Sequence, residues 1–395
     1  MNSCGHLSER WRRTAGNLLA GLVRLDSRNT ASLRDGEVCS PAEEAVCRYL
    51  ARQAEESGLR SRITYPAPGR PSIFIESPAA PAEPVLVFEA HMDTVGTDGM
   101  TIAPFSADIR NGRLFGRGAT DDKGSLAAMF TALLIAHEQR FPLRLVLAAT
   151  CAEENGCEGA PLLDFSDLEG ASFVVGEPTG NTIVTAHKSH VEATLTTRGR
   201  AGHASRGSPA DNAVLAMARV IVYIQDNWVP ALSRQSAGGL TTSNAAVTVI
   251  RGGTRVNVLP DTCTAGIDLR LVPGIAPESL VGNIVDGARK DLGVDLSAGN
   301  LNVAPALMTP PNCPLVRTLR DVLREHGLNA GLHSVDFCTN AGVFAQRGFP
   351  SLVFGPGDIS QAHSADEYLE LRELYKAVEI LGETACSVAE HTTAG

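Results

Sequence analysis

The stretch VLVFEAHMDTVGTDG, residues 85 to 99, indicates both the type of fold and a first candidate site. Its first four residues form an apolar run typical of a buried strand, and His91 and Asp93 follow two positions apart. In an extended chain such residues point to the same side, so Asp93 can accept a hydrogen bond from the His91 ring. That contact would fix which ring nitrogen is free to bind a metal. Polar residues also end strands that bind nothing, so the pair alone leaves both interpretations open.

Strand-like and helix-like segments alternate on both sides of this stretch. Apolar runs at 72–75, 143–149 and 173–175 have the length of strands, and residues 124–140 form an alanine- and leucine-rich helical segment. Such alternation is typical of an α/β layer structure. We therefore expect an α/β domain.

The pattern changes near residue 183. Residues 191–197 alternate like a half-exposed strand, an apolar helical face runs from 214 to 224, and strand-like runs follow at 245–250 and 262–271. A smaller α+β module inserted into the first domain accounts for this order. The expected parts are residues 1–182 and 306–395 for the larger domain and 183–305 for the insert.

Composition narrows the possible partners. The 395 residues are 44% apolar and 20% charged, which is ordinary for a soluble globular protein. The net charge of −10 disfavours nucleic acid and anionic membranes, and no apolar stretch reaches the ~20 residues of a membrane span. Residues 1–7 lack the features of a secretory signal, so we expect a cytoplasmic protein with a small-molecule partner. The nine cysteines have no regular spacing, which favours free thiols over disulfides or a cysteine zinc site.

Four further segments place polar side chains after apolar runs or in a glycine-rich turn. They are GRGATDDKG (116–124), CAEENG (151–156), VVGEPTG (174–180) and FGPGDISQAHSADEY (354–368). The first lacks the order GxxxxGK[ST] of a phosphate loop, and its adjacent aspartates suit a cation better than an anion. Ligand sites in open α/β sheets lie beyond the carboxyl ends of strands. Any one segment could be an ordinary loop, but together they favour one shared site.

This ordered set of motifs resembles the co-catalytic zinc exopeptidase and deacylase family, which includes acetylornithine deacetylase, succinyl-diaminopimelate desuccinylase, aminoacylase and glutamate carboxypeptidase. The resemblance covers about residues 15 to 385. It implies a three-layer α/β catalytic domain with an inserted α+β lid or dimerisation domain, and therefore a homodimer. It also implies a cis peptide bond between Asp121 and Asp122.

The resemblance assigns two divalent metal ions to five residues. His91 and Glu177 would bind one metal, Glu154 and His363 the other, and Asp121 would bridge them. Each metal then has three protein ligands and an open fourth position, which is the arrangement of a catalytic site. Nitrogen and oxygen ligands suit zinc and also accept cobalt or manganese.

Two more residues would complete the catalytic centre. Glu153 would be the general base that takes a proton from water and passes it to the leaving amine. Asp93 would be the partner of His91. Adjacent side chains on an extended segment face opposite ways, so Glu154 can bind metal while Glu153 addresses the water.

The insert contributes three more segments of interest. RGRAGHAS places His203 in a turn, and the matching histidine in the family stabilises the oxyanion, often across a dimer. RVNVLPD and GIDLRLVPG carry Asn257 and Arg270, and a guanidinium suits bidentate capture of a substrate carboxylate. A surface loop histidine and a structural salt bridge are the alternatives for His203 and Arg270.

Two departures from the family pattern keep the substrate class open. Many deacylases of the family have methionine after the bridging aspartate, whereas this chain has Asp122 there, as some peptidase branches do. VDFCTNAGVFAQRGFP (335–350) has Cys338-Thr339-Asn340 in place of the more usual glycine-threonine-serine or glycine-threonine-aspartate, and it resembles a branch described as selenium-metabolism-linked hydrolases. Thr339 would still contact the substrate carboxylate. Cys338 is either a packing thiol or one sensitive to oxidation.

Three functions follow as hypotheses. The first is hydrolysis of an N-acyl amino acid, and the second is dipeptidase or carboxypeptidase activity at the same site. The third is a catalytically inactive protein that binds metal or ligand in a regulatory role.

Overall fold

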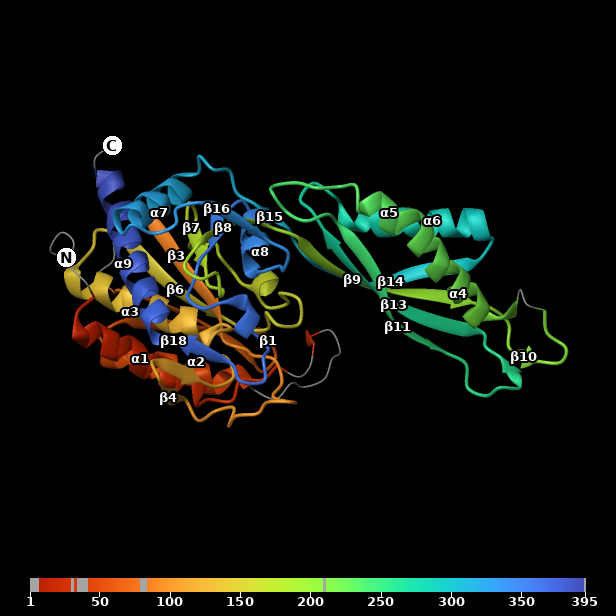
Figure 1. Ribbon diagram of the computed structural model, residues 1–395, viewed down its shortest axis with the longest axis horizontal. Coiled ribbons are helices and arrows are strands. Elements are labelled where there is room, and N and C mark those ends of the chain that lie inside the picture. The colour runs from red at the N-terminus through yellow and green to blue at the C-terminus, as the bar shows by residue number, and fades with distance from the viewer. Residues whose placement is uncertain (1–6, 30–31, 34–41, 79–83, 209–210, 394–395) are drawn as a thin grey trace. The chain divides into compact units, whose positions relative to one another are not determined.

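A computed structural model describes residues 7–29, 32–33, 42–78, 84–208 and 211–393. The chain forms two compact units (Figure 1). Unit 1 comprises Met1–Thr185, Thr309–His333 and Thr339–Gly395, and unit 2 comprises Ala186–Met308 and Ser334–Cys338. The last segment was expected in the larger domain, but it groups with unit 2, where Asp336 forms an ion pair with Lys188 at 3.1 Å.

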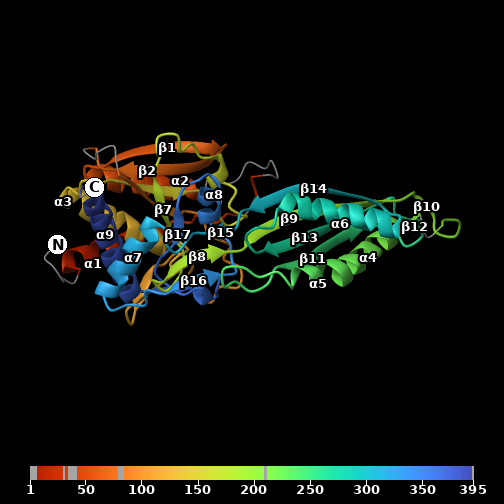
Figure 2. The same cartoon turned by 90° about the horizontal axis from the view of Figure 1, so that it is seen from above.

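A twisted mixed sheet forms the centre of unit 1. Its strands, in spatial order, are β1 (Arg60–Ala67), β2 (Arg70–Glu76), β6 (Arg144–Thr150), β3 (Val85–His91), β7 (Ser172–Val175), β17 (Ser351–Val353) and β8 (Ile183–His187). The short strands β15 (Leu307–Met308), whose residues belong to unit 2, and β16 (Leu332–Val335) pair with β8, and Figure 2 shows β1 and β16 at opposite edges. The four strands β6, β3, β7 and β17 are parallel, so their carboxyl ends meet at one edge.

Helices and a smaller layer cover the two faces of this sheet. One face shares a single apolar core with α1 (Glu9–Val23), α2 (Ala42–Glu56), α3 (Lys123–Gln139), α7 (Pro314–Glu325) and α9 (Leu371–Thr393). Leu86, Phe88 and Ala90 of β3 alternate into that core, as side chains of a strand must. On the other face Phe173 stacks on Phe344 of α8 (Asn340–Gln346). Unit 1 is therefore the expected three-layer α/β domain.

Short elements border the sheet. A three-stranded sheet contains β18 (Tyr368–Glu370), β5 (Arg113–Phe115) and β4 (Asp108–Arg110), and 3-10 turns lie at Ala160–Leu162 and Ile359–Gln361. Within the described residues, no helix has both the length and the apolar character needed to cross a membrane.

Unit 2 is an α+β module with its own core. Its antiparallel sheet has the order β11 (Asn244–Gly252), β13 (Thr262–Leu271), β9 (Ser189–Arg198) and β14 (Asp295–Ala304). The helical segments are α4 (Ala213–Tyr223), a π-helical turn (Ile224–Trp228), α5 (Val229–Leu232) and α6 (Pro277–Leu292). Alternate residues of β9 and β13 are buried, and their inward side chains form one cluster with those of α4 and α6. A separate ribbon pairs β10 (Gly202–His203) with β12 (Val258–Leu259).

Candidate metal centre

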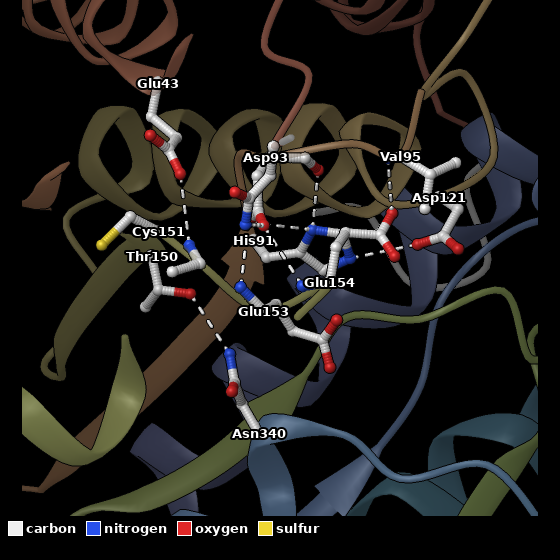
Figure 3. Close-up of polar contacts among 12 residues, drawn as sticks. Glu43, His91, Asp93, Val95, Asp121, Thr150, Cys151, Glu153, Glu154 and Asn340 are labelled. Carbon is white, nitrogen blue, oxygen red and sulfur yellow. Dashed lines mark hydrogen bonds and ion pairs between the residues drawn. The ribbon is translucent and has the colours of Figure 1, made fainter. Parts of the chain in front are cut away.

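Most of the candidate ligands lie at or after the carboxyl ends of the four parallel strands, at one edge of the sheet. His91 is the last residue of β3, Glu153 and Glu154 follow β6, Glu177 follows β7, and His363 lies in the loop after β17. Asp121 comes from the loop before α3, and its peptide bond to Asp122 is cis. Figure 3 shows the carboxylates around His91. The five expected metal ligands and Glu153 therefore come together.

Asp121 lies between the two histidines. Its Oδ1 is 3.0 Å from His91 Nε2, and its Oδ2 is 3.3 Å from His363 Nε2. His363 Nε2 is also 3.1 Å from Glu154 Oε2. Burial raises the pKa of Asp121, but hydrogen bonds with His363 and His91 hold it well below its usual value. Each oxygen of this carboxylate thus faces a different histidine.

The centre holds more negative charge than its histidines balance. Burial and the nearby Asp121 charge raise the pKa of Glu154 to about 7. Burial and the charges of Asp121 and Glu153 raise the pKa of Glu177 well above its usual value. Ligand atoms of His91, Glu153 and Glu177 lie within 4.8 Å of one another, as do those of His91, Asp121 and Glu154. Crowded carboxylates in such a buried place favour the binding of cations.

The spacing of these atoms fits metal ligation. Zinc bonds to nitrogen and oxygen are about 2.0 to 2.2 Å long, which places two ligand atoms of a tetrahedral site roughly 3.3 Å apart. The three contacts made by Asp121 and Glu154 with the histidines, at 3.0, 3.1 and 3.3 Å, match this value. The donor set and its geometry therefore fit divalent cations.

Asp93 contacts the site differently from the expectation. His91 Nδ1 is 2.9 Å from the backbone oxygen of Asp93 and 3.6 Å from its carboxylate, so the backbone oxygen is the nearer acceptor. The Asp93 carboxylate instead accepts the backbone N–H groups of Glu153 and Glu154, both at 3.1 Å, and the Asn29 amide at 2.9 Å. Asp93 thereby fixes the loop that carries both glutamates.

The sequence profile of peptidase family M20/M25/M40 matches residues 87–387, most of the chain. The chain belongs to this family. It is therefore a metal-dependent amidohydrolase or peptidase. The matched residues include all five candidate metal ligands.

Several relatives of this M20 chain have been named or solved. A probable succinyl-diaminopimelate desuccinylase of Staphylococcus aureus strain MSSA476 is 26% identical over 408 residues, covering 93% of this chain and 96% of the relative. A tripeptidase structure from Staphylococcus aureus Mu50 has 20% identity and a TM-score of 0.76, covering 98% of this chain and 100% of that one. A dinuclear metal binding peptidase of the M20 family from Bacillus subtilis has 15% identity and a TM-score of 0.71, covering 97% and 99%. These structural likenesses show that the fold is shared.

A buried glutamate that the sequence analysis did not single out holds the Asp121 loop of this M20 chain. Glu367 Oε1 accepts the backbone N–H groups of Thr120 at 2.9 Å and Asp121 at 3.1 Å. Its Oε2 accepts from Arg117 Nη1 at 2.6 Å and from the Gly118 N–H at 3.1 Å. Gly118 has φ +83°, and a Cβ there would approach a neighbouring side chain within 3 Å, so glycine is required. The only sequence signal was the position of Glu367 four residues after His363.

A second group missed by the sequence analysis supports the 151–154 loop. Glu43 of α2 and Arg70 of β2 form an ion pair and are both almost wholly buried. Glu43 Oε1 also accepts the backbone N–H of Ala152 at 3.2 Å, directly before Glu153 (Figure 3). Ala152 has φ +57°, in the left-handed region that alanine seldom adopts. The ion pair therefore supports an unusual turn next to the expected base.

The candidate residues of unit 2 lie at two separate places. His203 and Asn257 are close together, because β10 pairs with β12 and the Ala204 N–H donates to the backbone oxygen of Asn257 at 3.0 Å. Both residues are exposed. Arg270 lies near the other end of β13, and a rise of ~3.3 Å per residue puts it about 26 Å along the strand from Thr262. The structure thus does not bring Arg270 together with His203 and Asn257 within one chain.

Arg270 and Thr339 each have a partner in their own unit. Arg270 donates to Asp268 through Nε at 2.9 Å and Nη2 at 3.0 Å, so the structural salt bridge considered for it is present. Thr339 is buried, and its Oγ1 accepts the Ala341 N–H at 3.1 Å as the N-cap of α8. The Thr339 hydroxyl therefore has a structural contact that the sequence analysis did not anticipate.

Proposed function

We propose that this chain is a dinuclear metal hydrolase that cleaves the amide bond of an N-acyl amino acid. The observation that carries this proposal is the position of Asp121, whose two oxygens face His91 at 3.0 Å and His363 at 3.3 Å. A carboxylate placed in this way suits bridging between two cations. We assign His91 and Glu177 to one cation, and Glu154 and His363 to the other.

Zinc is the cation we assign, with cobalt and manganese as alternatives, because the donors are nitrogen and oxygen. When bound, such a pair lowers the pKa of water and polarises the amide carbonyl. A relative in the same family, from Bacillus subtilis, is described as a dinuclear metal binding peptidase, which supports two ions.

Glu153 is the residue we assign to proton transfer. It lies among the ligand atoms of His91 and Glu177, within 4.8 Å, and its backbone is held by Asp93. From there its carboxylate takes a proton from the attacking water and returns it to the nitrogen of the leaving amine. Glu154, on the same loop, faces His363 instead, so the two adjacent glutamates have different tasks.

Substrate recognition is assigned to Arg270, Asn257 and Thr339. The contact of Arg270 with Asp268 uses Nε and Nη2, and we assign Nη1 to the substrate carboxylate. Asn257 would add a donor to the carboxylate or to the oxyanion. For Thr339 the backbone beside α8 is the better candidate, since its hydroxyl caps the helix.

His203 is assigned to the oxyanion in the site of a second copy of the chain. Its place beside Asn257, at the end of the unit 2 sheet away from Arg270, supports such a contribution. Its imidazole is exposed, and Nδ1 contacts Ser205 Oγ at 2.7 Å, which orients the ring. We therefore propose a homodimer. The test is a mixture of the His203→Ala and Glu153→Ala proteins after their subunits have been allowed to exchange. The mixture would regain part of the activity if His203 acts in the site of the second copy. It would stay inactive if each site is complete in one chain.

The rival within enzymes is a dipeptidase or carboxypeptidase. One relative is named a probable desuccinylase and a structural neighbour is a tripeptidase, so the comparisons support either class. The deciding experiment is a screen of the metal-reconstituted protein with N-acetyl, N-succinyl and N-formyl amino acids and with dipeptides, followed by product analysis. Turnover of dipeptides alone would overturn the N-acyl assignment.

The rival from another class is an inactive protein that binds metal or ligand. The presence of Glu153 together with all five presumed ligands argues against it. Hydrolysis that disappears in Glu153→Ala would exclude it. Metal binding without turnover of any substrate in the screen would support it.

A cytoplasmic location remains our expectation.

A further inference from the structure

The loop of residues 152–157, which carries Glu153, has an unusual backbone conformation at both of its ends. Ala152 has φ +57° and Cys157 has φ +56°, in the left-handed region that residues with a Cβ seldom adopt. Glycine fits such positions best, yet Cys157 follows a glycine and occupies one of them itself. Residues held in this region against their preference cluster at functional sites.

Cys157 holds Glu153 through both its backbone and its side chain. The Cys157 N–H donates to the Glu153 backbone oxygen at 2.7 Å, which closes the loop. The Cys157 thiol donates to Glu153 Oε1, with Sγ 3.2 Å from the oxygen. An ionised carboxylate can only accept, so the proton of this bond belongs to the sulfur. Thiols are weak donors, but the negative charge of the acceptor strengthens the bond.

The residues next to Cys157 fix its position. The N–H groups of Glu158 and Gly159 donate to the Ala152 oxygen at 2.8 and 3.2 Å. The Glu158 carboxylate accepts the Leu33 N–H at 2.6 Å, which ties a segment near the N-terminus to the loop. Cys157 itself is almost wholly buried, with 1% of its surface exposed. The sulfur is therefore held at the carboxylate, where solvent does not compete for the contact.

The orientation of the Glu153 carboxylate decides whether it can act as a base. A glutamate side chain has several rotatable bonds, and a base must lie within hydrogen-bond reach of the proton that it takes. A ligand atom of Glu153 lies within 4.8 Å of those of His91 and Glu177, so the side chain reaches the metal centre. A thiol bound to Oε1 limits the rotation of the carboxylate at that place.

Packing alone is the alternative explanation for Cys157. Cys47 and Cys263 belong to the apolar cores of units 1 and 2, where a thiol acts as a small apolar group. The sulfur of Cys157 contacts a charged oxygen instead, four residues earlier in the chain. An apolar side chain would fill the same space without that contact. The two explanations therefore predict different results for substitutions at this position.

We propose that Cys157 is a positioning residue that directs the Glu153 carboxylate toward the attacking water through its thiol hydrogen bond. This inference rests on the proposed function, in which Glu153 transfers the proton. The S–H bond itself is not broken during turnover. Loss of the thiol should therefore slow the reaction without weakening the binding of metal or substrate.

The first test compares substitutions at position 157 in the metal-reconstituted protein, with the substrate that is turned over fastest in the screen. Cys157→Ala should lower kcat about 5- to 20-fold, a part of the roughly 10²- to 10⁴-fold contribution of a general base, with KM and metal content unchanged. Cys157→Ser keeps a donor and should recover most of kcat. Alanine and serine meet the same difficulty in the left-handed backbone, so their difference isolates the donor.

Cys157→Gly separates the thiol from the turn. Glycine adopts φ +56° readily, so this variant should relieve the backbone and still lower kcat as alanine does. The control Cys47→Ala removes a buried thiol from the core of unit 1 and should leave kcat unchanged. Wild-type kcat in Cys157→Gly or Cys157→Ala would overturn the proposal. Equal kcat in Cys157→Ser and Cys157→Ala would also overturn it.

An infrared measurement on the metal-free protein tests the contact independently of activity. The difference spectrum between wild type and Cys157→Ala isolates the S–H stretching band of Cys157. A hydrogen bond to a carboxylate lowers the frequency of this band, so the band should move to higher frequency in a Glu153→Ala background. The band of Cys47, isolated in the same way, should stay in place. A Cys157 band that does not move would contradict the proposed contact.

The outcomes separate this inference from the proposed function. Full activity in Glu153→Gln would overturn the proposed function, and the role of Cys157 with it. An inactive Glu153→Gln together with wild-type kcat in Cys157→Ala and Cys157→Gly would overturn the role of Cys157 alone.

Discussion

The carboxylate of Glu367 accepts a hydrogen bond from the backbone N–H of Asp121 at 3.1 Å. The same side chain accepts from the Arg117 guanidinium and from the backbone N–H groups of Gly118 and Thr120, so one buried group orders four donors of the loop before α3. Asp121 is the residue we assign to both cations. The placement of a metal-bridging carboxylate therefore depends on a residue nearly 250 positions later in the chain.

Glu367→Gln is expected to weaken metal binding and lower activity about 10- to 100-fold, as changes to groups that orient metal ligands do. The amide keeps one acceptor oxygen but presents an N–H₂ group to donors, so part of the loop loses its support. Competition with a metal chelator measures the affinity. The control is Glu325→Gln at the exposed end of α7, which should leave metal affinity unchanged. Equal affinities of wild-type and Glu367→Gln proteins would show that Asp121 is held by other contacts.

Arg70→Met is expected to lower the free energy of unfolding by about 3 to 5 kcal/mol, the usual cost of leaving one member of a buried ion pair without its partner. Glu43 and Arg70 are both almost wholly inaccessible to solvent, so water cannot replace the lost contact. Urea denaturation at pH 7 measures this loss.

The double variant Glu43→Gln/Arg70→Met is the matched control for that measurement. It removes both charges, so it should be less destabilised than Arg70→Met alone. A loss below about 1 kcal/mol in the single variant would mean that Glu43 accommodates the change, for example by taking up a proton.

Much of the fold could be predicted from periodicity. The strand β13 has the predicted bounds, Thr262–Leu271, because strict alternation marks each of its residues. The apolar run marks β3 only as far as Phe88, whereas the strand continues to His91. Glu89 is buried there by hydrogen bonds from Thr150 and Asn340, which come from distant segments. Local pattern cannot indicate a polar residue that is paired in this way.

The site was predictable to the extent that its chemistry resides in side chains after strands. His91 and Glu177 could be found because strand ends of a parallel sheet converge at one edge. The contacts of Glu367 and Asp93 could not be found, because their donors are mostly backbone N–H groups, which every residue except proline has. The separation of His203 from Arg270 likewise depends on strand pairing within unit 2.

Glu153→Gln and Glu154→Gln are expected to fail in different ways. Glu153→Gln removes the proton acceptor and should lower kcat about 10²- to 10⁴-fold while the metal content stays near that of the wild type. Glu154→Gln weakens the contact with His363, now 3.1 Å, and should lose metal as well as activity. Metal analysis after gel filtration, combined with initial rates, separates the two. Metal loss in Glu153→Gln, with metal retained in Glu154→Gln, would exchange their roles.

The pair of His190 and Asp268 predicts how stability depends on pH. The pKa of His190 is raised to about 9, so its contribution is fully present below about 6.5 and is lost as the pH rises through 9. Burial raises the pKa of Asp268, but hydrogen bonds from His190 and Arg270 lower it to about 2. The contribution of Asp268 is therefore present above its ordinary value near 4 and is lost only in strong acid.

Between about pH 4.5 and 6.5 both contributions act together, so His190→Gln should destabilise the protein most in that window. The difference in unfolding free energy between wild type and variant, measured by urea denaturation at pH 5.5, 7.5 and 9.5, should fall steadily along this series. A difference that is constant or grows from pH 5.5 to 9.5 would mean that His190 is neutral in the folded protein.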